Sequence, residues 1–355
     1  MGKGRVARKV AAAAAYGGGG ASVLGGSFWG LILAEAQLAR RAIGNADGDP
    51  PNPSGWYGHG RPGPALGIAL LGDSSAAGYG VGTVEETPGA HIASGVARTA
   101  DRRVYLTSVA RVGAQTKDLH EQLDRVLPLE PQVAVIFVGA NDVTHAVPIR
   151  TSVRELDSVL ARLRGAGVAA VLATCPDLGT IEPLAPPLKQ LARAWSRRLA
   201  EAQASTAVEH GARAVAVGSI LASEFQRLSD LLFGPDRFHP SAAGYARMSA
   251  AVLPTVLAAL GLVPDEDADP ELHRGEAVLP LDLAVHEAAR HPGSSVEPVE
   301  EQQGSGPLGR FAVLRRRRRG PGGDVERPSP APEDDSPGTD PDHEPEAGTV
   351  EETAG

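Results

Sequence analysis

Between residues 65 and 263, short apolar runs alternate with segments of helical periodicity, and this alternation strongly constrains the fold. The runs are rich in Ala, Val, Leu and Ile along their whole length, as expected for strands buried on both faces of a sheet. Strands that alternate with helices predict an α/β fold, a mostly parallel sheet with helices on both sides. The expected strands are 66–72, 104–110, 133–139, 168–174 and 213–218, and the expected helices are 86–99, 116–127, 151–165, 186–209 and 241–260.

Composition limits the classes of function. Aromatic residues make up only 4% of the chain, so the core must consist mainly of Ala, Val and Leu. The formal net charge is −9, but residues 264–355 contain 22 acidic and 9 basic residues, which leaves residues 1–263 at +4. No basic patch interleaved with aromatic residues is present, so we expect no nucleic-acid partner. The single cysteine, Cys175, can form no intramolecular disulfide and is expected to be a small buried apolar side chain.

Residues 1–41 form a basic stretch followed by an uncharged segment. Four Lys or Arg residues precede residue 10, and residues 10–34 contain no charged side chain. This length suits a membrane span better than the apolar core of a signal peptide, and the basic flank favours a cytoplasmic N-terminus. We expect a single membrane anchor with residues 65–263 outside the cytoplasm. A cleaved signal, which gives a secreted protein, and a flexible Gly/Ala arm are the alternatives.

Two further segments flank the alternating region. Residues 42–64 are rich in Gly, Pro, Asn and Asp and are expected to be a linker, in which residues 56–58 can pack against the domain. Residues 264–355 are acidic and rich in Pro, Gly and Ser, and we expect them to be disordered because they bury too little apolar area. Within this tail, residues 279–289 have the pattern of a short amphipathic helix. Residues 315–319 are five arginines, which suit either a solvated stretch or a contact with anionic lipid or wall polymer.

A candidate nucleophile, Ser74, directly follows the first expected strand in the sequence Gly72-Asp73-Ser74. Open α/β sheets bind ligands beyond the carboxyl ends of their strands, which is where this serine is expected. A serine hydroxyl is a weak nucleophile and needs a base within hydrogen-bonding reach. His239 is the candidate base, and Asp236, three residues earlier, is expected to hold its other ring nitrogen and stabilise the imidazolium.

Asn141 and Gly113 are candidates for stabilising the negative charge that develops on a carbonyl oxygen. Asn141 follows the strongly apolar run 133–138, and its side-chain amide can donate a hydrogen bond to an oxyanion. Gly113 offers a backbone N–H with no side chain in the way. The backbone N–H of Ser74 would complete a hole with three donors.

Taken together, these motifs resemble the SGNH hydrolases, the GDSL-type esterase and lipase superfamily. The matching blocks are Gly72-Asp73-Ser74 for the nucleophile, Gly113 for the glycine block, Gly139-Ala140-Asn141-Asp142 for the Gly-x-Asn-Asp block and Asp236-x-x-His239 for the last block. The resemblance covers residues 65–263. Ser75 departs from the name-giving motif, which has Leu at this variable position.

The resemblance implies a flavodoxin-like three-layer α/β/α sandwich with a five-stranded parallel sheet, without a cofactor or metal. It also implies a two-step reaction: Ser74 attacks an ester or thioester carbonyl, His239 takes its proton, the alcohol leaves, and water hydrolyses the acyl-enzyme. The oxyanion would be held by the Ser74 and Gly113 N–H groups and by Asn141. We therefore expect a serine esterase of short acyl or acetyl esters.

The substrate class is left open by the sequence. Small-molecule esters, lipid esters, acylated carbohydrates and thioesters all suit the predicted chemistry. Few aromatic residues and the lack of an obvious apolar lid argue against long-chain lipase activity. Tyr79 and His145 are candidate substrate-lining residues, and a monomer is expected.

Three alternative interpretations fit parts of the sequence. An α/β-hydrolase also has the order Ser, Asp, His, but expects Gly-x-Ser-x-Gly, and Ala76 occupies the last position here. The glycines at 78, 80 and 82 depart from the dinucleotide-binding Gly-x-Gly-x-x-Gly, because position 83 is Thr. The third interpretation is not enzymatic: a membrane-tethered cell-envelope binding protein with an inactive hydrolase fold. Equal ester hydrolysis by the wild type and Ser74→Ala would favour it.

Overall fold

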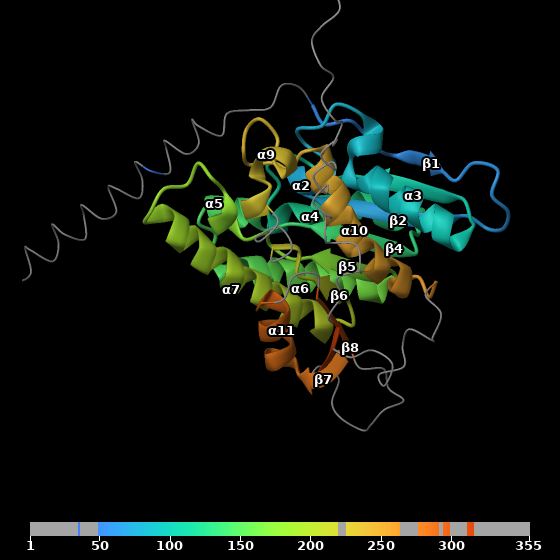
Figure 1. The fold of residues 1–355 in the computed structure, drawn as a ribbon. Helices are drawn as coiled ribbons and strands as arrows, with labels where there is room; N and C mark the ends of the chain where they lie inside the picture. Colours follow the sequence, from blue (N-terminus) through green and yellow to red (C-terminus); the bar gives the residue numbers. More distant parts are fainter. Residues whose placement is uncertain are drawn as a thin grey trace, which may run out of the picture. The chain divides into compact units, whose positions relative to one another are not determined.

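Five parallel strands in the order β3-β2-β4-β5-β6 form the centre of the sheet (Figure 1). The computed structural model describes residues 35, 49–218, 225–262, 276–290, 294–298 and 311–315. The parallel strands are β2 (Leu66–Gly72), β3 (Val104–Ser108), β4 (Val133–Phe137), β5 (Ala169–Ala173) and β6 (Arg213–Val215). All five were expected from the sequence, since strands buried on both faces give continuous apolar runs.

Helices connect these strands, as the alternating pattern predicts. The helices between residues 66 and 262 are α2 (Ser74–Ala77), α3 (Pro88–Ala100), α4 (Leu119–Val126), α5 (Ala140–Thr144), α6 (Ile149–Gly165), α7 (Leu188–Glu209), α9 (Ser229–Leu232) and α10 (Ala242–Ala259). Short 3₁₀ turns are η1 (Val84–Glu86), η2 (Thr116–Asp118), η3 (Leu127–Leu129) and η4 (Leu178–Thr180). The five longer helices expected from the sequence are all present, which confirms the α/β fold.

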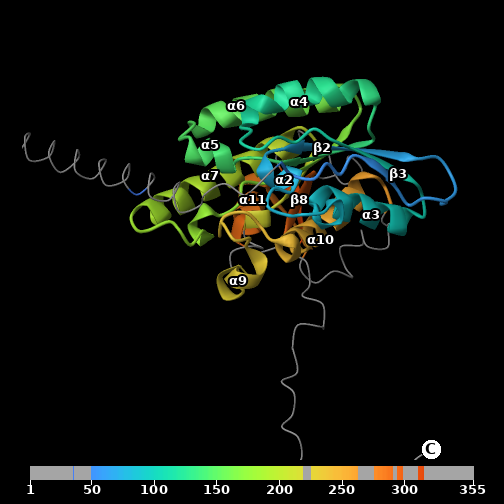
Figure 2. The same ribbon diagram turned by 90° about the horizontal axis from the view of Figure 1, so that it is seen from above.

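The layers follow from the alternation of side chains along each strand. Ala69 and Leu71 of β2 belong to an apolar cluster with α4, α6 and α7, whereas Ile68 and Leu70 pack with α3 and α10. Figure 2 shows α4 and α6 on one side of the sheet and α3 and α10 on the other. The sheet is therefore covered on both faces, and its strand ends are the places where a site can open.

The sheet contains more than the five predicted strands. Within residues 42–64, predicted to be a linker, β1 (Gly55–Tyr57) pairs antiparallel with β3. The aromatic rings of Trp56 and Tyr105 meet edge to face at 5.0 Å, and Tyr57 packs against the core. These side chains explain why a segment rich in Gly and Pro adds a strand at this edge.

The prediction of a disordered tail from residue 264 is wrong for three stretches. Three tail strands, β7 (Glu276–Pro280), β8 (Ser295–Pro298) and β9 (Phe311–Arg315), and one helix, α11 (Leu281–Arg290), belong to the fold. β8 pairs antiparallel with β6, and β9 and β7 continue the sheet, which therefore has nine strands in the described residues. The overall acidic composition hid short apolar runs whose partners lie far away in the sequence.

The tail elements bury apolar side chains in the main core. Ala284 and Val285 of α11, together with Val296 and Leu314, join the cluster that includes Ala207 of α7. The helix expected at residues 279–289 is thus present as α11. The arginines at 316–319 lie outside the described residues.

The predicted membrane segment also lies outside the described residues. Glu35, the first charged residue after it, is described, and its carboxylate accepts a hydrogen bond from the backbone N–H of Leu188 at 2.9 Å. Among the helices in the described part of the chain, none is both long enough and apolar enough to cross a bilayer. The anchor therefore stays a prediction.

Replacing Leu314 tests whether the tail strands contribute to the folded core. Its side chain is 1% exposed, so Leu314→Ala should lower the free energy of unfolding by about 2–5 kcal/mol. Leu283 on α11 is 50% exposed, and Leu283→Ala should change the free energy of unfolding by less than about 0.5 kcal/mol. Chemical denaturation of the full chain measures both. An equally small effect of the two substitutions would contradict this packing.

Candidate active site

The carboxyl ends of the parallel strands lie at one edge of the sheet, and a cavity opens there. Ser74 follows β2, Asn141 lies in α5 after β4, and His239 comes from the turn between α9 and α10. All three residues line the same cavity. The fold therefore brings together side chains that are separated by up to 165 residues.

The turn that presents Ser74 requires a glycine at its start. Gly72 has a φ of +135°, and a Cβ at this position would lie 1.9 Å from the carbonyl oxygen of Phe137. The next residue, Asp73, donates its N–H to that same carbonyl at 3.0 Å. Its carboxylate then caps α2 by accepting the N–H of Ser75 at 2.9 Å. Ser74 is thus the first residue of a short helix that begins directly at the strand end.

The carboxyl group of Asp73 is buried, and its pKa is raised. Burial raises the pKa of Asp73 to about 6, although hydrogen bonds from Ser75 and the nearby His239 oppose the shift. The carboxyl is 1% exposed and lies on the cavity lining beside Ser74. Its usual N-cap role explains its position, since a carboxylate is a preferred acceptor for the first N–H groups of a helix.

Ser74, His239 and Asp236 form one hydrogen-bonded chain. The Nε2 atom of His239 lies 3.0 Å from the Ser74 hydroxyl, and its Nδ1 lies 2.6 Å from a carboxylate oxygen of Asp236. The other oxygen of Asp236 accepts the backbone N–H groups of Phe238 and His239 at 3.0 and 2.9 Å. This arrangement leaves Nε2 as the ring nitrogen that can accept a proton from the hydroxyl.

The hydrogen bonds keep Asp236 ionised. Burial raises the pKa of Asp236, but the bonds from the His239 ring and from two backbone N–H groups outweigh it, so the pKa lies below its usual range. An ionised carboxylate at Nδ1 stabilises the positive charge that the imidazole gains on protonation.

Two aromatic rings fix the orientation of the imidazole. Tyr79 and Phe238 meet the His239 ring edge to face, with centroids 4.8 and 4.7 Å apart. The fully buried Tyr245 donates its hydroxyl to the carbonyl of Tyr79 at 2.9 Å. Tyr79 was expected to line the substrate pocket, but it packs against His239 and is not among the residues that line the cavity.

The predicted oxyanion donors lie in adjacent segments. The side-chain amide of Asn141 donates one hydrogen bond to the carbonyl of Ala114 at 3.1 Å, which places it beside the Gly113 turn. Gly113 is exposed and has a φ of +80°. Asp142, 1% exposed, accepts the Thr116 N–H at 3.1 Å and so ties this loop to α5.

His145 does not reach the cavity. It is exposed at the end of α5, where its Nδ1 lies 2.8 Å from the carbonyl of Asn141. It was expected to line the pocket, but it is not among the residues that line the cavity. Cys175 is buried, and burial holds the pKa of its thiol well above the usual range. It is therefore a small core side chain, as the sequence predicts.

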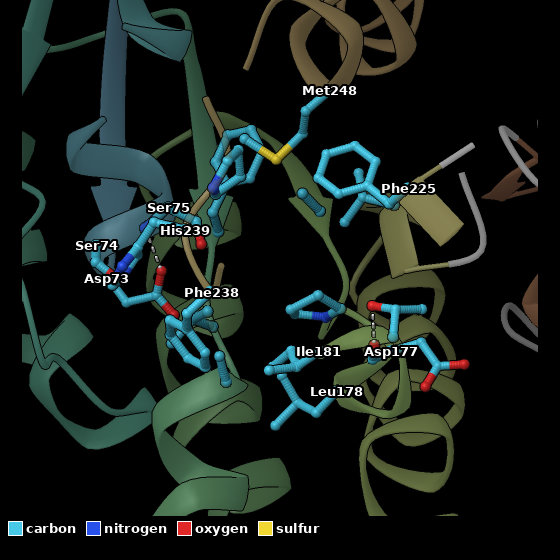
Figure 3. A pocket seen from close by; sticks show the side chains of 18 of the residues that line it. Asp73, Ser74, Ser75, Asp177, Leu178, Ile181, Phe225, Phe238, His239 and Met248 are labelled. Carbon is cyan, nitrogen blue, oxygen red and sulfur yellow. Dashed lines mark hydrogen bonds between the residues drawn. The ribbon is translucent and has the colours of Figure 1, made fainter. Parts of the chain in front are cut away.

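A mainly apolar cavity of about 50 Å³ opens beside Ser74. Figure 3 shows Asp73, Ser74 and His239 on one side of it and Leu178 and Ile181 on the opposite side. Its apolar lining consists chiefly of Phe137, Val138, Ala173, Leu178, Ile181, Val217, Phe225, Phe233, Phe238 and Met248.

Ion pairs hold the cavity wall after β5. Asp177 accepts the Gly179 N–H at 2.8 Å and the guanidinium of Arg197 at 3.0 Å. Further along, Glu182 accepts from Arg237 at 2.7 Å, which joins the wall to the turn that carries His239. These partners could not be predicted from the sequence, because they lie 20 and 55 residues apart and show no local pattern.

Comparisons with known proteins identify the family of this chain. The GDSL-like lipase/acylhydrolase family matches residues 70–247, which include Ser74 and His239. A GDSL-like esterase of Mycobacterium tuberculosis is 35% identical over 281 residues, which cover 76% of this chain and 84% of the relative.

Solved structures with a similar arrangement include two esterases. An esterase of Pseudoalteromonas is 17% identical, with a TM-score of 0.43, over 55% of this chain and 96% of its own. An acetylxylan esterase of Geobacillus stearothermophilus is also 17% identical, with a TM-score of 0.42, over 55% of this chain and 94% of its own. On the family match and the mycobacterial relative, the chain belongs to the GDSL-like lipase/acylhydrolase family of ester hydrolases.

Proposed function

We propose that this protein hydrolyses carboxylic esters of short acyl chains through an acyl-enzyme on Ser74. The observation that carries the proposal is the hydrogen-bonded chain from the Ser74 hydroxyl to His239 Nε2 at 3.0 Å, and from His239 Nδ1 to Asp236 at 2.6 Å. Nucleophilic catalysis by serine requires a base within hydrogen-bonding distance of the hydroxyl and a third group that orients the base.

The first step forms the acyl-enzyme. The Ser74 oxygen attacks the ester carbonyl carbon while its proton passes to His239 Nε2, and the ionised Asp236 stabilises the imidazolium. The negative charge on the carbonyl oxygen is held by the Ser74 and Gly113 N–H groups and by the free N–H of the Asn141 amide. One such donor lowers the barrier by about 3–4 kcal/mol.

His239 completes the first step by giving its proton to the departing alcohol oxygen as the carbon–oxygen bond breaks, which leaves the acyl-enzyme. The second step releases the acid. His239 takes a proton from water, whose oxygen attacks the acyl carbon, and returns the proton to the Ser74 oxygen as the bond to the acyl group breaks. No further group is needed for the balance of atoms and electrons.

The cavity supports a preference for short acyl chains. A volume of about 50 Å³ is small but exceeds the roughly 10–15 Å³ that a cavity needs to hold one water molecule, so a small group can enter. The methyl end of a short acyl chain would contact apolar side chains such as Leu178 and Ile181. Acetylated carbohydrates and small-molecule esters share this acyl group and are the substrate classes that we propose.

Removing the Ser74 hydroxyl tests the proposed nucleophile. Ser74→Ala should lower kcat/KM for 4-nitrophenyl acetate by at least about 10³-fold, because only the oxyanion donors and binding remain. Ser75→Ala removes the neighbouring hydroxyl but leaves the contact between Ser74 and His239, so its loss should be far smaller. Equal rates of ester hydrolysis by the wild type and Ser74→Ala would contradict the proposal and favour an inactive binding protein.

A series of 4-nitrophenyl esters tests the acyl preference. Each methylene that the cavity accepts adds about 0.8 kcal/mol, or about fourfold in kcat/KM, so activity should rise to butyrate and gain nothing beyond hexanoate. Ile181→Trp should fill the cavity and make acetate the best substrate. Leu191→Trp, on α7 and outside the cavity lining, is the control and should leave the series unchanged. A steady rise through octanoate in the wild type contradicts the assignment.

A further inference from the structure

Two buried glutamine side chains lie at the strand ends that carry the site, and the proposed reaction assigns them no role. Gln122 of α4 is 3% exposed and Gln203 of α7 is 1% exposed. A buried amide is costly unless its oxygen and its NH₂ group both find partners. In each glutamine, both groups bond to the main chain at a strand end.

Gln122 holds the peptide from which the Ser74 turn begins. Its Oε1 accepts the N–H of Gly72 at 2.7 Å, and its Nε2 donates to the carbonyl of Gly72 at 2.9 Å. Gly72 is the last residue of β2 and lies two residues before Ser74. The amide thus fixes both polar groups of the residue at which the strand leaves the sheet.

Gln203 holds the segments that lead to Asn141 and to the cavity wall. Its Oε1 accepts the N–H of Cys175 at 2.7 Å, and its Nε2 donates to the carbonyl of Val138 at 3.1 Å. The pairing of β4 with β5 ends at Phe137 and Ala173. Val138 and Cys175 follow these strand ends, so Gln203 bridges two segments just past the paired part of the sheet.

The local sequence leaves space for this bridge. A Cβ on Gly139 would lie 3.1 Å from Nε2 of Gln203 and 2.8 Å from the Cβ of Cys175. Gly139 also has a φ of +132°, which strains other residues. Glycine at position 139 therefore leaves room for the Gln203 side-chain amide. Gly139 lies only two residues before Asn141 in the sequence.

We propose that Gln203 and Gln122 are positioning residues of the esterase reaction. Gln203 sets the place of the oxyanion donor Asn141, and Gln122 sets the place of the nucleophile Ser74. The assignment rests on the proposed function. A shift of about 1 Å in a reacting group can lower the rate by about 100-fold. Loss of the two hydrogen bonds of either glutamine should therefore lower kcat more than it raises KM.

The chain contains a matched control for this proposal. Gln132 is exposed, and its Oε1 accepts the N–H of Gly67 at the opposite end of β2. Gln132→Leu removes the same kind of amide contact from the same strand, far from the site. Its kcat should equal that of the wild type.

Kinetics of the full chain test the positioning role. Gln203→Leu and Gln122→Leu should each lower kcat by about 10- to 100-fold with KM within about threefold. In an Asn141→Ala background, Gln203→Leu should lower kcat by less than about threefold, because the donor that it places is already gone. Gln122→Leu should keep its full effect there. If Gln203→Leu has the same effect in both backgrounds, or none, the proposal fails.

A conservative variant distinguishes the loss of the two hydrogen bonds from misfolding. Gln203→Glu in its acid form keeps an acceptor for the Cys175 N–H and a donor for the Val138 carbonyl. It should therefore retain more activity than Gln203→Leu at matched thermal stability. Equal losses in the two variants would contradict the role of the two hydrogen bonds.

A readout without catalysis separates this proposal from the esterase assignment. The chain has only three asparagines, Asn45, Asn52 and Asn141, so ¹⁵N-asparagine labelling yields three side-chain amide signals. The Asn141 signal, assigned by its loss in Asn141→Ala, should shift in Gln203→Leu and stay in place in Gln132→Leu. An unmoved signal overturns the positioning role even in an active enzyme. A shifted signal in a protein that hydrolyses no ester overturns the proposed function alone.

Discussion

The close approach of Gly72 to the carbonyl of Phe137 is the constraint on which the site depends. At this point β2 passes so near β4 that no side chain fits, and the chain turns directly into the short helix that begins with Ser74. The backbone of the sheet itself therefore sets the position of the proposed nucleophile, Ser74. Asn141 follows the neighbouring strand β4, so the same pair of strands places the nucleophile and the predicted oxyanion donor.

The other residues of the proposed catalytic chain, Asp236 and His239, come from the part of the sequence that follows the last parallel strand. The turn from Asp236 to His239 lies between α9 and α10, and Glu182 and Arg237 join it to the cavity wall. The helix α10 buries Tyr245, whose hydroxyl reaches back to the Tyr79 carbonyl. Packing of α10 thus supports both the proposed base, His239, and the Tyr79 ring that flanks it.

Local patterns predicted most of the fold and the central side chains. Buried parallel strands are continuous apolar runs, and Asp236 and His239 are three residues apart, so both could be found without long-range information. The tail strands could not, because β8 pairs with β6 about 80 residues away and lies in an acidic segment. His145 was expected at the cavity because it is close to Asn141 in the sequence, but such spacing does not reveal which residues of a short helix line a cavity. Gln122 and Gln203 had no pattern to mark them.

Covalent labelling of the full chain with an aryl dialkyl phosphate tests the central claim most directly. The Ser74 oxygen should form a bond to phosphorus as the aryl oxide leaves, with the proton passing to His239. Peptide mass spectrometry should then locate the label on Ser74, and Asp236→Asn should slow the labelling. A label on Ser75 or Cys175, or no label on an enzyme that hydrolyses esters, would contradict the account.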